Sequence, residues 1–143
     1  MIDLSVLPVG ARVTVDTAPI IYLLEGHPQF SKQYQPLFER IEAGELRGIV
    51  SVVTLAEVLA GPLRHGNEIL ADRYYRALTS SAHWQIQEMD SELSFMAARI
   101  RARYRLKLPD AIQVATAIHS SSSALVTHDR VFSSVDEIRI LGL

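Results

Sequence analysis

The chain has 143 residues, and its 14 lysines and arginines against 16 aspartates and glutamates give a formal net charge of −2. Hydrophobic residues make up 48% of the chain and charged residues 21%, a balance typical of a globular protein and not of a disordered one. The absence of cysteine excludes disulfides, zinc–thiolate sites, iron–sulfur clusters and a cysteine nucleophile.

The length favours a single domain over residues 1–143. No apolar run approaches the roughly 18 residues that a membrane span needs. The N-terminal segment carries an acid at Asp3 and no basic stretch, which argues against a signal peptide. We therefore expect a soluble, cytoplasmic protein with no membrane partner.

Short apolar segments alternate with amphipathic segments along the chain. Strands are expected at residues 12–15, 48–53, 83–88, 124–127 and 138–141. Helices are expected at residues 19–24, 32–43, 54–60, 67–78, 91–104 and 110–119, the third of them ending at Gly61 and Pro62. Strands that alternate with helices predict a parallel sheet, and hence an α/β fold built as a three-layer α/β/α sandwich.

Four acidic residues fall where the strands of such a sheet end. Asp16 follows the first strand, and Glu57 lies in the first turn of the helix that follows the second strand. Asp110 lies in the first turn of a later helix, and Asp129 follows the strand that ends at Thr127. Because ligands of open parallel sheets bind outside the carboxyl ends of the strands, we expect these four carboxylates to converge on one edge.

Each acid also has an ordinary structural explanation, and taken singly that explanation is the better one. Asp16 can cap its helix, and Thr54-x-x-Glu57 fits a capping box. Asp110 suits the positive end of a helix dipole, and Asp129 suits a turn.

The joint occurrence of the four acids favours a metal site. Two carboxylates about 4 Å apart repel by roughly 4 kcal/mol at an effective dielectric constant of 20. Four together cannot all stay ionised without a cation or raised pKa values. Oxygen ligands with no histidine or cysteine in the pattern select Mg²⁺, or Mn²⁺ in its place.

At these residues the chain resembles the PIN-domain ribonucleases, most closely the VapC-like toxins of bacterial and archaeal toxin–antitoxin pairs. The resemblance covers nearly the whole chain in the family's order and spacing. It is carried by VDT at 15–17, IIYLL at 20–24, SVVTLAEVL at 51–59, LPDAIQVATA at 108–117 and LVTHDRVF at 125–132. The family often has a further acid where this chain has Val131, so Asp129 must serve alone in that motif.

The resemblance implies a PIN-like fold and metal-dependent endonucleolytic cleavage of RNA, which leaves a 5′-phosphate and a 3′-hydroxyl. It implies that Asp16, Glu57, Asp110 and Asp129 form the catalytic quartet that holds Mg²⁺. Thr17 and Thr127 match the polar residues that accompany the quartet. A homodimer and a cognate antitoxin that blocks the acidic site are implied as well.

Other functions stay open from the sequence. A PIN-like domain can bind RNA or protein without turnover, or cleave RNA in processing without being a toxin. A haloacid-dehalogenase-like phosphatase is disfavoured, since Ala18 stands where its second aspartate is needed. Beside Asp129, Arg130 is a candidate contact for phosphate or for an antitoxin carboxylate, or a plain surface ion pair, and His128 is a candidate proton shuttle.

Overall fold

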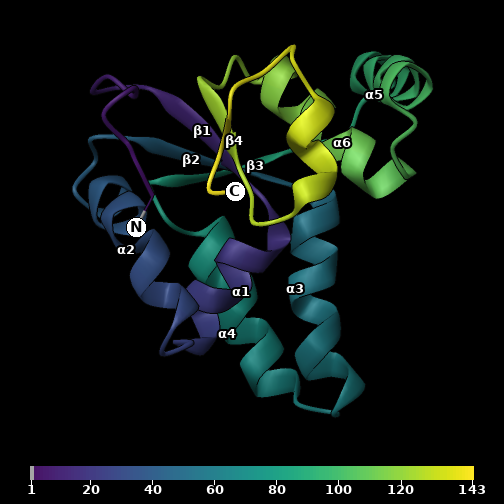
Figure 1. Ribbon diagram of the computed structural model, residues 1–143. Coiled ribbons are helices and arrows are strands. Elements are labelled where there is room, and N and C mark those ends of the chain that lie inside the picture. Colours follow the sequence, from purple (N-terminus) through teal and green to yellow (C-terminus); the bar gives the residue numbers. More distant parts are fainter. Residues whose placement is uncertain (1) are drawn as a thin grey trace.

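A five-stranded parallel sheet runs through the computed structural model, which describes residues 2–143 (Figure 1). Its strands are β1 (Arg12–Val15), β2 (Arg47–Ser51), β3 (Trp84–Gln87), β4 (Ala124–Val126) and β5 (Ile140–Leu141), in the spatial order β3-β2-β1-β4-β5. The strand order reverses at β1, which pairs with β2 on one side and with β4 on the other. The predicted parallel sheet is therefore confirmed.

Helices cover both faces of this sheet (Figure 1). One face carries α1 (Thr17–Glu25), α2 (Phe30–Glu42), α3 (Val52–Arg64) and α4 (Glu68–Thr79), and the other carries α5 (Ser91–Tyr104) and α6 (Leu108–His119). A 3-10 helix, η1 (Arg130–Ser134), follows β4. The predicted three-layer α/β/α sandwich is confirmed. No helix within residues 2–143 is both long and apolar enough to cross a membrane.

Successive strand residues point to opposite faces, so each strand contributes to two cores. Val13, Val15 and Val126 pack with the residues of α1–α4. Leu125, which precedes Val126 on β4 and points to the opposite face, packs with residues of α5 and α6. Because both faces are covered, β1, β2 and β4 are buried apart from the arginines at the starts of β1 and β2, and each buried Val or Leu contributes about 1.5–3 kcal/mol by leaving water.

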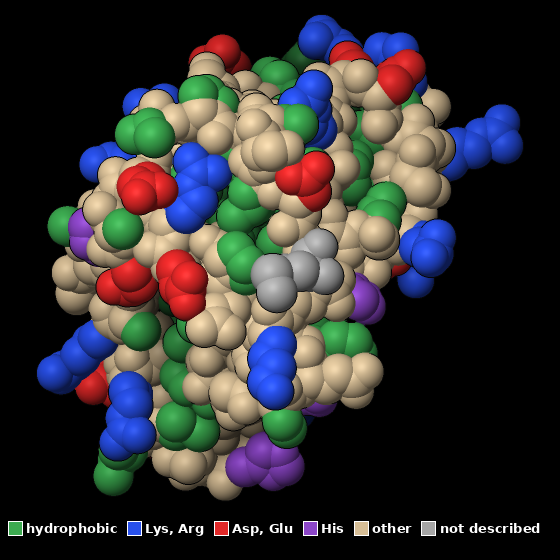
Figure 2. All heavy atoms as spheres, turned by 60° about the vertical axis from the view of Figure 1, so that its left-hand side comes forward, with side chains coloured by type: hydrophobic (Ala, Val, Ile, Leu, Met, Phe, Trp, Pro, Cys, Tyr) green, Lys and Arg blue, Asp and Glu red, His purple; other side chains and the backbone are tan. Residues whose placement is uncertain are grey.

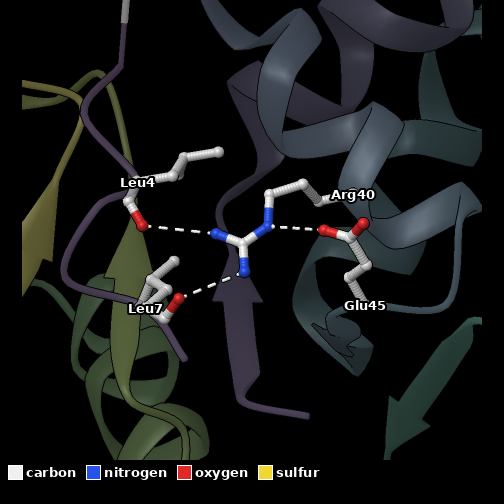
Figure 3. Close-up of polar contacts among 4 residues, drawn as sticks. All are labelled: Leu4, Leu7, Arg40 and Glu45. Atoms are coloured by element: carbon white, nitrogen blue, oxygen red, sulfur yellow. Dashed lines mark hydrogen bonds and ion pairs between the residues drawn. The ribbon is translucent and has the colours of Figure 1, made fainter. Parts of the chain in front are cut away.

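The segment before β1 is held against α2 by Arg40, whose side chain is partly buried (Figure 3). The guanidinium of Arg40 donates to the carbonyl oxygens of Leu4 (3.3 Å) and Leu7 (3.1 Å) and pairs with Glu45 (3.1 Å). Both leucines are buried.

A space-filling view shows acidic and basic side chains interspersed over one face of the molecule (Figure 2).

The start of α3 differs from its prediction. The strand β2 ends at Ser51, whose Oγ accepts the backbone N–H of Thr54 (3.1 Å) and caps the helix. The helix therefore begins at Val52, and Glu57 lies in its second turn. The predicted first-turn position of Glu57 and its capping box with Thr54 are both wrong.

The far end of α3 and the start of α2 also differ. Helix α3 continues through Gly61 and Pro62 to Arg64, and the Pro62 carbonyl accepts the N–H groups of His65 (3.1 Å) and Asn67 (3.0 Å) where the helix ends. Helix α2 begins at Phe30 instead of residue 32. The ring Nδ1 of His27 accepts the N–H groups of Gln29 (3.3 Å) and Phe30 (3.2 Å), which supplies a cap that the sequence pattern does not reveal.

One glycine of the sheet is required by its neighbour. Gly48 on β2 pairs in register with Trp84 on β3, and a Cβ at Gly48 would overlap the Trp84 ring. We expect Gly48→Ala to lower the free energy of unfolding by about 1–3 kcal/mol, because the buried ring must shift in a packed core. Urea denaturation followed by circular dichroism measures this loss.

Gly61 provides the matched control. It lies in the interior of α3 with nothing within 4 Å of a built Cβ. Gly61→Ala should change the free energy of unfolding by no more than about 1 kcal/mol, because the smaller loss of backbone entropy in a helix is offset by the contact of the new Cβ with the following Pro62. Equal effects of the two substitutions would contradict the packing argument.

Candidate active site

The four predicted acids line one pocket at the carboxyl edge of the sheet, where the strand order reverses between β1 and β4. The pocket has a volume of about 280 Å³. Its lining includes Asp16, Thr17, Glu57, Asp110, Gln113 and Asp129. A crevice at such a reversal is the usual ligand site of open α/β sheets. The structure thus brings together residues that lie more than 100 positions apart in the chain.

Asp16 is held by three hydrogen-bond donors. Its Oδ1 accepts the backbone N–H of Thr17 (2.8 Å) and the amide of Gln113 (2.8 Å), and its Oδ2 accepts the hydroxyl of Thr127 (2.8 Å). Asp16 is also the N-cap of α1. Its capping role and its place in the pocket are therefore compatible, and the donors fix the direction of its carboxylate.

Asp129 is tied to the same group through Thr127. The buried hydroxyl of Thr127 accepts the backbone N–H of Asp129 (3.0 Å) while it donates to Asp16. The Asp129 carboxylate accepts the N–H of Val131 (2.9 Å) and caps η1. Asp129 itself is exposed, so it lies at the mouth of the pocket.

Glu57 is oriented from α1. The Thr17 hydroxyl donates to Glu57 Oε1 (3.0 Å) and lies 3.0 Å from the hydroxyl of Thr54, which is fully buried on α3. The amide of Gln113 reaches the same Thr54 hydroxyl at 2.6 Å. The predicted supporting threonines, Thr17 and Thr127, both contact carboxylates of the pocket.

Sequence reasoning missed Gln113 and Thr54. Each lies three residues from a predicted acid on the same helix, Gln113 after Asp110 and Thr54 before Glu57, and this spacing places both members of a pair on one helix face. Gln113 is also the one amide in the run 111–117 of α6, whose other residues are apolar apart from Thr116. A buried polar residue one turn from a candidate ligand is the signal that could have found them.

Electrostatic repulsion within the pocket is visible at Asp110. Burial raises the pKa of its carboxyl, and the negative charges of Asp129, Asp16 and Glu57 raise it further, while Lys107 opposes them. Asp110 lies in the first turn of α6, where the helix dipole favours a carboxylate. Burial and repulsion outweigh that dipole, so the four acids lie within electrostatic reach of one another.

The donors of the pocket suit a hard divalent cation. Carboxylate oxygens are the ligands that Mg²⁺ and Mn²⁺ prefer, and none of the lining residues is a histidine. Within residues 2–143, no three acidic or histidine side chains already lie close enough to ligate one ion together. Asp16 accepts three hydrogen bonds, whereas Glu57 and Asp129 accept one each and are exposed.

The two other candidates near the site lie outside the pocket lining. The His128 ring is hydrogen-bonded through Nδ1 to the Tyr34 hydroxyl (2.9 Å) and packs against the rings of Tyr22 and Phe30. That geometry directs the ring toward α1 and α2, so it does not support a proton shuttle. Arg130 is exposed at the start of η1, and it forms no ion pair within the described part of the chain.

Three solved structures illustrate the likeness in fold. A chain of VapBC-1 from nontypeable Haemophilus influenzae is 19% identical with a TM-score of 0.70, over 90% of this chain and 96% of that chain. A chain of a toxin–antitoxin complex from Klebsiella pneumoniae is 23% identical with a TM-score of 0.66, over 88% of this chain and 94% of that chain. Mycobacterium tuberculosis VapC20, described as a toxin that cleaves the sarcin–ricin loop, is 16% identical with a TM-score of 0.67, over 89% of this chain and 98% of that chain.

No curated protein matches the chain in sequence. A family model, that of the PIN domain, matches residues 13–138, which is most of the chain. The fold agrees with that match, and the chain belongs to the PIN-domain family.

Proposed function

We propose that the protein is a metal-dependent endoribonuclease that hydrolyses phosphodiester bonds in RNA, and that it is the toxin of a toxin–antitoxin pair. The observation that carries the proposal is the convergence of four carboxylates on one pocket, where burial and then repulsion from the other three acids raise the pKa of Asp110. Such repulsion is costly unless a cation offsets it. Membership of the PIN-domain family supports the assignment.

The four carboxylates would hold Mg²⁺, with Mn²⁺ as a substitute. A bound ion would supply an activated water and would neutralise charge on the phosphate during an in-line displacement. Asp16 contributes a carboxylate whose direction is set in advance by three donors. Asp110 contributes a partly buried charge, and the exposed Glu57 and Asp129 flank the opening through which a phosphodiester would enter.

The partners in this proposal are RNA, a cognate antitoxin and a second copy of the chain. The antitoxin is supported by the similarity in fold to chains from VapBC and toxin–antitoxin complexes. RNA is supported by the similarity to a toxin described as cleaving the sarcin–ricin loop. The homodimer rests on the family resemblance alone and stays a prediction. At the opening of the pocket, Arg130 is available to a phosphate or to an antitoxin carboxylate.

Metal binding should be measurable as a gain in thermal stability. We expect Mn²⁺ or Mg²⁺ to raise the melting temperature, because the ion binds the folded site and not the unfolded chain. At a metal concentration of 100 times Kd, the free energy of unfolding rises by about 2.7 kcal/mol. Asp110→Asn should remove most of this gain. Asp72→Asn, on the exposed Asp72–Arg76 pair of α4, is the control that should keep it. A wild-type melting temperature that ignores metal would contradict the site.

The same variant tests the repulsion in the absence of metal. The folded pKa of Asp110 is raised, so its ionisation destabilises the fold as pH rises from the ordinary carboxyl range through that raised pKa. At pH 7 metal-free Asp110→Asn should therefore be more stable than wild type, by up to about 1 kcal/mol or 3 °C after allowing for partial exposure. At pH 3 the difference should vanish. Thermal melts in EDTA at both pH values measure it.

Activity is tested by cleavage of a structured RNA pool. Protein free of antitoxin should cut RNA with Mg²⁺ or Mn²⁺ and not with EDTA, and end mapping should find 5′-phosphates and 3′-hydroxyls. Asp110→Asn should reduce the rate at least about 100-fold, since loss of a ligand costs no less than loss of its supporting contacts. RNA binding without any cleavage would favour a binding module instead, and cleavage that resists EDTA would contradict the metal mechanism.

A further inference from the structure

A hydrogen-bond chain whose direction can be assigned connects the acids of the pocket. The Thr17 hydroxyl has one hydrogen, which it donates to Glu57 Oε1 (3.0 Å). Its 3.0 Å contact with Thr54 must therefore be a bond that the Thr54 hydroxyl donates. Thr54 accepts in turn from the Gln113 amide (2.6 Å). Every donor in this chain points toward Glu57.

Gln113 is the origin of the chain, and the orientation of its amide is fixed. An ionised Asp16 can only accept, so the nitrogen and not the oxygen of Gln113 must face it. One N–H then binds Asp16 and the other binds Thr54. Through these two bonds a single side chain of α6 orients Asp16 after β1 and, by way of two threonines, Glu57 on α3.

The remaining amide atom of Gln113 has no partner. Its Oε1 is buried without a hydrogen bond, in a side chain that is only 2% exposed. An unsatisfied buried acceptor costs about 1–3 kcal/mol. A methionine of similar volume would fill the same space without that cost. The two hydrogen bonds that Gln113 donates contribute a free energy of the same order as this cost, so the stability of the fold gives little net reason for a glutamine here, whereas the orientation of the two carboxylates does.

We propose that Gln113 is a positioning residue, which holds the carboxylates of Asp16 and Glu57 in the arrangement that a divalent cation needs. This inference rests on the proposed function and adds to it a residue that acts through the ligands and does not touch the ion. Its consequence is that stability and metal affinity separate: removing the amide weakens the site without weakening the fold.

Gln113→Met tests the inference, because it keeps the volume and removes both the two donors and the unpaired acceptor. Isothermal titration with Mn²⁺ should give a Kd about 10–100-fold weaker than wild type, the usual loss for a contact that supports a ligand. The metal-free melting temperature should stay within about 3 °C of wild type or rise. In RNA cleavage at fixed Mg²⁺, kcat should fall while KM for RNA changes little.

Thr116→Val is the matched control on the same helix. Thr116 lies three residues after Gln113, is 1% exposed and also has a buried oxygen without a partner. It does not line the pocket. Thr116→Val should leave the Mn²⁺ affinity and the cleavage rate unchanged and should not lower the melting temperature.

A second pair of variants tests the chain at Thr54 and serves if Gln113→Met fails to fold. Thr54→Val removes the hydroxyl and should weaken Mn²⁺ binding, whereas Thr54→Ser keeps the hydroxyl and should restore it. Wild-type Mn²⁺ affinity in both Gln113→Met and Thr54→Val would overturn the inference, as would a lowered melting temperature with unchanged affinity. A wild-type protein that binds no Mn²⁺ would overturn the proposed function together with it.

Discussion

Mutual repulsion among four carboxylates is the constraint on which the site depends. Asp16, Glu57, Asp110 and Asp129 come from segments spread over the length of the chain, and nothing local in the sequence would bring them together. The burial of the strands on both faces supplies the free energy that does so. Because β1 and β4 pair side by side in the sheet, the segments that follow them bring Asp16 and Asp129 to the same edge.

The four acids divide the cost of this arrangement unequally. Asp16 accepts three hydrogen bonds, which stabilise its charge. Asp110 is half-buried and has no comparable set of donors, so the raised pKa falls on it. Glu57 and Asp129 stay near water, where the solvent screens them. One carboxylate is thus held by three donors, and two lie at the exposed edge of the pocket, an arrangement compatible with the cation and the substrate phosphate that we propose for the site.

The sequence predicted the elements whose signals are local, and missed the features that depend on distant contacts. Asp16 and Thr127 could be placed at strand ends because apolar runs stop beside them. The start of α3 could not be placed, since Val52 and Val53 continue the β-branched run of the strand. The helix begins there because the buried hydroxyl of Ser51 caps it. Gln113 was missed for a similar reason. Its partner Asp16 lies 97 residues earlier, and its apolar neighbours indicate a core helix.

From the sequence, each acid could serve either as a residue at a helix start or turn or as part of a site. In the structure, three of the acids lie at a helix start and also line the pocket. Asp16 caps α1, Asp129 caps η1, and Asp110 lies in the first turn of α6. Backbone N–H groups at a helix start stabilise a nearby negative charge, so a helix terminus is where a carboxylate can be ionised at least cost. A site that must gather acids before any cation arrives therefore favours the positions where acids are ordinary capping residues. Glu57 is the exception, because it lies in the second turn of α3, and it is the acid that needs Thr17, Thr54 and Gln113 to orient it.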